Sequence, residues 1–141
     1  MTDISEFTDE QLLPFDGVWD LFREMSASGI SQFSEIVIRN LFAQMSLINS
    51  YDEIRLSQLE AIYDTQKLSL GLCKSKLLAI KYRDGAMNNR TAEVEADKEY
   101  QQEANNLDNA NINLVIQKGR VKASAIAANC LSREISARIA K

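Results

Sequence analysis

The side chains in this chain that could do chemistry are mostly cations, and they fall into two groups. The first group is Lys67, Lys74, Lys76, Lys81 and Arg83, in a stretch of residues 65–83 that contains no acidic side chain. The second group is Lys118, Arg120 and Lys122. Cations at this density can neutralise the phosphates of a nucleic acid. They can equally be the solvated edge of a packed helix. At helical pitch, Lys118 and Lys122 share a side, whereas Arg120 points away from them.

The sequence contains no candidate catalytic site. The chain has no histidine, which removes the commonest general base and the commonest transition-metal ligand. It contains no GxxxxGK[ST], GxGxxG or GxSxG motif. The acidic side chains of residues 93–99 alternate around a helix start, where they suit the positive end of the helix dipole. We therefore expect a protein that is not an enzyme and that uses no cofactor and no metal.

Charge is unevenly distributed along the 141 residues, whose net charge is −4. Residues 1–64 carry twelve acidic and three basic side chains, whereas residues 65–141 carry eight acidic and thirteen basic ones. No apolar run reaches the length of a membrane span, and the N-terminus is acidic where a secretory signal would be basic. These features predict a cytoplasmic protein without a membrane partner. Cys73 and Cys130 lack a CxxC companion, which favours reduced core thiols.

Composition predicts an all-α fold, because the chain has five glycines and one proline and is rich in strong helix formers. Residues 1–30 are expected to form an acidic helical arm. Thr8 begins a capping box for a first short helix, which Pro14 should end. Asp16 can cap a second short helix, and Gly29 suits the position after its last turn.

Residues 31–141 are expected to form a hairpin and oligomerisation domain. Within residues 33–83, ten apolar side chains keep one helical phase, which favours a single long helix, although Ser50 could begin a second helix within it. They are Val37, Leu41, Met45, Ile48, Leu59, Ile62, Leu70, Cys73, Leu77 and Ile80. The segment RDGAMNNR then provides a turn, and Thr91 caps a last helix over residues 92–140. Two long helices joined by a short loop must pack as an antiparallel hairpin.

The last helix carries two apolar stripes on opposite sides. One fits a heptad seam, with Asn111, Lys118 and Ser132 as polar interruptions among Tyr100, Ala104, Leu107, Leu114, Val121, Ala125, Ala128, Ile135 and Ile139. The second stripe consists of Ile112, Val115, Ile116, Gly119, Ala123, Ile126 and Cys130. One partner helix cannot cover both stripes, so either the N-terminal arm or other subunits must cover the second. We favour other subunits, which predicts a homo-oligomer that assembles through the last helix.

Three segments of the second half carry a resemblance to a known family. They are SKLLAIKYRDG, TAEVEADKEY and LSREISARIAK. From about Tyr63 onward, the chain resembles the UvsY-like recombination mediators of T-even phages. The resemblance implies a ring-like helical oligomer that binds single-stranded DNA and helps to load a RecA-type recombinase while single-strand-binding protein is displaced. It implies DNA contacts at Lys67, Lys74, Lys76, Lys81 and Arg83. The acidic arm departs from the family pattern.

Three functions therefore remain open. The first is a non-catalytic, oligomeric accessory protein of phage DNA recombination or replication. It would bind single-stranded DNA and a recombinase or single-strand-binding protein in the cytoplasm of an infected bacterium. The second is a structural or assembly protein, such as a virion component or an adaptor, in which the same helices only oligomerise. The third is an acidic inhibitor of a host nucleic-acid-binding protein, with the acidic half of the chain as its active surface.

Overall fold

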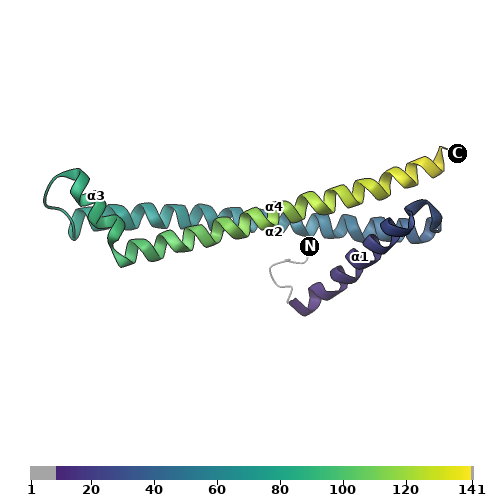
Figure 1. The fold of residues 1–141 in the computed structure, drawn as a ribbon, viewed down its shortest axis with the longest axis horizontal. Coiled ribbons are helices and arrows are strands. Elements are labelled where there is room, and N and C mark those ends of the chain that lie inside the picture. The colour runs from purple at the N-terminus through teal and green to yellow at the C-terminus, as the bar shows by residue number, and fades with distance from the viewer. Residues whose placement is uncertain (1–8, 141) are drawn as a thin grey trace. The chain divides into compact units, whose positions relative to one another are not determined.

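The structure, a computed structural model, describes residues 9–140, with side chains from Phe15 onward. Its helices are α1 (Asp9–Ser28), a short 3-10 turn (Ile30–Gln32), α2 (Glu35–Ile80), α3 (Met87–Ala96) and α4 (Lys98–Ile139). The long helices α2 and α4 pack against each other as a hairpin, and α1 is the N-terminal arm (Figure 1). No strand occurs in the described residues, so the predicted all-α fold is confirmed. Within residues 9–140, no helix is both long enough and apolar enough to cross a bilayer.

The chain divides into two compact units, and each long helix contributes to both of them. Unit 1 combines Met1–Leu56 with Gln117–Lys141, and unit 2 is Ser57–Ile116. Each unit is therefore built on one segment of α2 and one segment of α4. Unit 1 adds the arm α1 to this pair, and unit 2 adds the short helix α3.

The core of unit 1 brings α1 together with both long helices. Met25 of α1, Ile38 and Met45 of α2 and Leu131 of α4 are completely buried. Phe15, Val18, Trp19 and Phe22 pack against this core from α1. Burying a large apolar side chain contributes about 1.5–3 kcal/mol. This apolar face explains why α1 packs with the two long helices in unit 1.

The prediction of two short helices in the arm is wrong, because α1 is continuous through Pro14 and Asp16. Pro14 is only the sixth residue of α1, so its missing N–H removes a hydrogen bond near the helix start. The apolar side chains that follow Pro14 pack against the unit 1 core and stabilise the rest of α1. Gly29 ends α1 with a φ of 97°, as expected of a glycine at that position. The capping box at Thr8 lies outside the described residues.

Helix α2 is unbroken at Ser50, which confirms the expectation of one long helix. Ser34 precedes its first turn, and the Ser34 hydroxyl accepts a hydrogen bond from the Val37 N–H at 3.4 Å. The predicted apolar phase is largely correct, since Leu41, Met45, Ile48, Leu59, Cys73 and Leu77 are buried. Three of its members are nevertheless exposed, namely Val37, Ile62 and Ile80.

The connection between the long helices differs from the prediction. Helix α3 begins at Met87, so Thr91 lies inside a helix and does not cap one. The break falls instead at Asp97, whose carboxylate accepts the Glu99 N–H at 2.9 Å and so caps α4. Val94 explains why α3 is a separate helix, because its side chain is completely buried with Cys73 and Leu77 of unit 2. Gly85 supplies the expected turn, with a φ of 105°.

The predicted seam of α4 is correct at every second position and is displaced by one residue toward the N-terminus at the positions between them. Leu114 is buried and Val121, Ala128 and Ile135 are partly buried, as predicted. At the alternate positions, the structure buries Ala110, Gln117, Ser124 and Leu131 in place of the predicted Asn111, Lys118, Ala125 and Ser132. The displacement arises because two of these seam positions are polar and are satisfied by contacts with α2. Cys73 is a buried free thiol as expected, whereas Cys130 is free but exposed, so its placement in a core is wrong.

Candidate nucleic-acid interface

The first group of cations lies in unit 2, with Lys67, Lys74 and Lys76 on α2 and Lys81 and Arg83 just after its end. Lys67, Lys74 and Lys81 are seven residues apart, so they form one row along the helix with steps of about 10.5 Å. Lys81 follows the last residue of α2, and its N–H still bonds to the Leu77 carbonyl at 3.0 Å. Lys76 lies on another side of the helix. The predicted contact set is therefore a short row with Lys76 outside it.

Lys81 is engaged within unit 2 by a nearly buried carboxylate. Its Nζ lies 2.7 Å from Oδ2 of Asp97, and the Tyr82 hydroxyl donates a hydrogen bond to the same oxygen at 2.6 Å. The hydrogen bonds from Lys81 and Tyr82 hold the pKa of Asp97 well below its usual range. The hydrogen bond with Asp97 also raises the pKa of Lys81. Lys81 therefore neutralises a charge of its own fold, which weakens its case as a phosphate ligand.

Three of the five predicted cations in unit 2 remain without an ion pair among the described residues. Lys76 lies 3.5 Å from the Glu99 carboxylate, in a pair whose two side chains are more than half exposed. Such exposed pairs contribute little to stability, so Lys76 can exchange partners. Lys67, Lys74 and Arg83 have no carboxylate within ion-pair distance in the described part of the chain.

Arg90 is a structural residue that sequence reasoning did not identify. Its Nε donates to the Tyr82 carbonyl at 2.7 Å, and its Nη2 donates to the Leu78 carbonyl at 2.9 Å. The carbonyls at the end of a helix lack intrahelical partners, and a cation is favourable there. Arg90 therefore closes the end of α2 from α3. The only sequence signal for this role of Arg90 is its position shortly after the turn at Gly85.

The second group of cations lies in unit 1. Lys118, Arg120 and Lys122 are exposed on α4, and none has an ion pair within the described residues. Burial raises the pKa of Asp52, and the positive charge of Arg120 offsets part of that rise. Arg120 is thus associated with the α2 side of unit 1, while helical pitch places Lys118 and Lys122 together on another side.

A buried polar layer in the unit 1 seam was also missed by the sequence analysis. The Asn49 amide donates to the Val121 carbonyl at 3.1 Å and to the Ser124 hydroxyl at 3.0 Å. The Gln117 amide donates to the backbone carbonyl of Asp52 at 2.9 Å. Burial raises the pKa of the Asp52 carboxyl, although hydrogen bonds from Ser124 and Gln117 oppose this shift. Directional contacts of this kind fix the register of α2 against α4 in unit 1.

The predicted oligomer interface on α4 is exposed. Ile112, Ile116 and Ile126 are 55%, 52% and 59% exposed, and Gly119, Ala123 and Cys130 are exposed as well. In unit 1, α1 packs against the core that contains Leu131 and leaves Ile126 and Cys130 uncovered. The alternative in which the arm covers this part of the second stripe is therefore wrong.

Comparisons of the chain with known protein families, with curated proteins and with solved structures found no match. The described surface includes cations that lack an ion pair among residues 9–140, and an apolar stripe on α4 that the fold does not bury.

Proposed function

We propose that this protein is a non-catalytic, oligomeric accessory factor of phage-type DNA recombination or replication. It binds single-stranded DNA together with a recombinase or a single-strand-binding protein. The observation that carries the proposal is the row on α2 in which Lys67 and Lys74 have no ion-pair partner among the described residues. Binding a phosphate to such a cation breaks no existing ion pair, and it releases counterions from the DNA.

Assembly supports the same proposal. Two unpaired lysines per chain bind DNA weakly, but several copies in one particle raise the effective concentration of the contacts. The exposed stripe with Ile112, Ile116 and Ile126 is a surface that such a homo-oligomer can bury. The resemblance to UvsY-like mediators points in the same direction, and it supplies the class of protein partner.

Fluorescence anisotropy with a labelled single-stranded oligonucleotide tests this function. The affinity of the wild-type protein is expected to fall as salt rises, by about 0.7 log units per log unit of salt for each phosphate contact. The double variant K67E/K74E should flatten that dependence. The matched control is Lys76→Glu, on another side of the same helix, which should keep the slope. No binding at low salt, or an unchanged slope in the double variant, would reject the proposal.

The second candidate is a structural or assembly protein, which a specific observation favours. Lys81 of the basic row is paired with Asp97, and Lys76, on another side of α2, is paired with Glu99, so two of the five cations have partners within unit 2. If light scattering shows a defined oligomer that K67E/K74E leaves intact, and no oligonucleotide binds at low salt, assembly is the role of these helices.

A further inference from the structure

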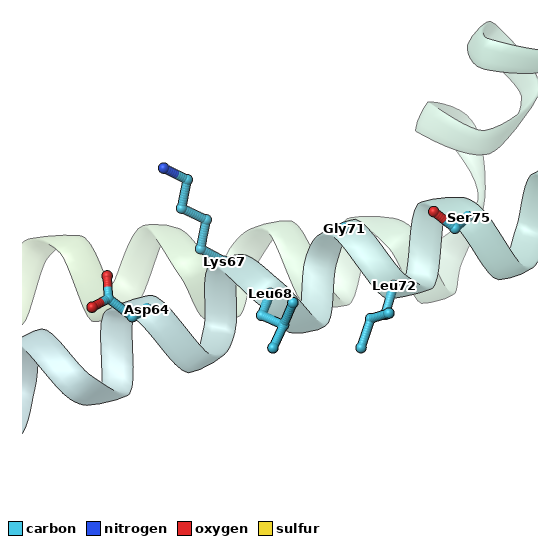
Figure 2. A pocket seen from close by; sticks show the side chains of 6 residues that line it. All are labelled: Asp64, Lys67, Leu68, Gly71, Leu72 and Ser75. Atoms are coloured by element: carbon cyan, nitrogen blue, oxygen red, sulfur yellow. The ribbon is translucent and has the colours of Figure 1, made fainter.

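The side of α2 that faces away from the hairpin seam in unit 2 carries a second heptad pattern. Its members, called the outer seam below, are Ala61, Thr65, Leu68, Leu72, Ser75 and Ala79, and all of them are exposed. Leu68 and Leu72 are 64% and 62% exposed, and they leave the helix on the same side (Figure 2). Large apolar side chains at helical spacing with no cover are typical of a helix that binds another helix.

Gly71 creates a depression beside the two leucines. The open depression measures about 490 Å³, and its lining includes Asp64, Lys67 and Ser75 as well as Leu68, Gly71 and Leu72. A Cβ atom placed on Gly71 would meet no atom within 4 Å. Glycine is less favourable than alanine inside a helix, and no described side chain fills the space above it. The depression therefore lets another helix approach closely.

The outer seam is symmetric about position 70 when the chain direction is reversed. Ala61 then exchanges with Ala79, Thr65 with Ser75, and Leu68 with Leu72. Each exchange pairs side chains of one kind: alanine with alanine, leucine with leucine, and one small hydroxyl side chain with another. An antiparallel copy of α2 would therefore set leucine against leucine and small residue against small residue. Gly71 lies one residue from the centre of this symmetry, where two such helices would cross.

We propose that the outer seam of α2 binds the outer seam of a second copy of this chain in an antiparallel orientation, with the two Gly71 residues close to the twofold axis. The contact is isologous, since the same residues serve both copies. It is distinct from the α4 stripe and does not depend on DNA binding. A chain with both surfaces can join more copies than either surface alone.

Site-specific cross-linking tests the orientation and the register. In a background of Cys73→Ala and Cys130→Ser, a short bismaleimide is expected to link Gly71→Cys chains to one another, because the two positions meet near the axis. Ala61→Cys chains should not link to themselves, since they would lie about 27 Å apart along the helix. A mixture of Ala61→Cys and Ala79→Cys chains should give a mixed dimer. Self-linking of Ala61→Cys, or no linking of Gly71→Cys, would overturn the proposal.

Sedimentation velocity supplies a second readout on otherwise unmodified chain. The double variant L68E/L72E is expected to weaken self-association at least about tenfold, because it removes the central apolar contacts. Ile112→Glu is the matched control on the α4 stripe, and it should leave the Gly71→Cys cross-link in place. Wild-type protein that stays monomeric at high concentration would overturn the proposal.

Discussion

Replacing Arg90 with alanine is expected to release α3 from the end of α2. The guanidinium donates two hydrogen bonds, to the Tyr82 carbonyl at 2.7 Å and to the Leu78 carbonyl at 2.9 Å. Hydrogen bonds from charged groups contribute about 1.5–3 kcal/mol each. Arg90 is partly exposed, so water replaces part of this, and we expect a loss of about 2–3 kcal/mol for unit 2.

The effect should be local because α3 cannot stand alone. It has 10 residues, and isolated helices shorter than about 12–15 residues are marginal in water. Hydrogen exchange measured by mass spectrometry should therefore show faster exchange in residues 78–97 and unchanged exchange in the unit 1 core.

Two matched variants complete the experiment. Arg90→Lys keeps the charge but lacks the forked donor pair, so it should lose about half as much stability as the alanine variant. Arg83→Ala removes a cation that has no ion pair among the described residues, and it should leave exchange unchanged. Arg90→Ala that exchanges like Arg83→Ala would refute the assigned role of Arg90.

Three further predictions concern stability. The pKa of Asp97 is lowered by Lys81 and Tyr82, so its stabilisation is present above its ordinary pKa of 3.8 and is lost as pH falls toward the folded value. Thermal melts of Asp97→Asn should lack this acid-sensitive part, and an acid profile equal to wild type would contradict the assignment. Burial raises the pKa of Asp52, so its effect has the opposite sign: stability is favoured where the carboxyl is protonated and is lost as pH rises through the folded pKa. Asp52→Asn should therefore raise the melting temperature at neutral pH, and a lower one would show that the hydrogen bonds outweigh the burial cost. Leu131 is completely buried, so Leu131→Ala should cost about 2–5 kcal/mol in urea unfolding, whereas the exposed Cys130→Ala should change little.

Helical periodicity was sufficient to predict the hairpin and the single helix α2. Apolar residues recur on one face of the helix from Leu41 to Leu77. This spacing is visible in the sequence, because a buried helix face needs apolar residues at regular intervals. Gly29 and Gly85 were also predictable, since positive φ is inexpensive only for glycine. These features depend on local chemistry alone.

The register of α4 and the break at Asp97 were not predictable in this way. Gln117 and Ser124 occupy seam positions because Asn49 and the Asp52 carbonyl lie across from them, and that fact involves residues 65–75 positions away in the chain. Asp97 looked like one more acidic residue of a helix start. Its capping role depends on the burial of Val94, which is a tertiary effect.

For the candidate interface, too, the sequence predicts the residue types but not their contacts. Composition identified all five cations of residues 65–83, but it could not tell which of them the fold uses. The ion pair between Lys81 and Asp97 joins residues on either side of α3, and the 3.5 Å pair between Lys76 and Glu99 joins α2 to α4. Lys67 and Lys74 stand out only after these contacts are known.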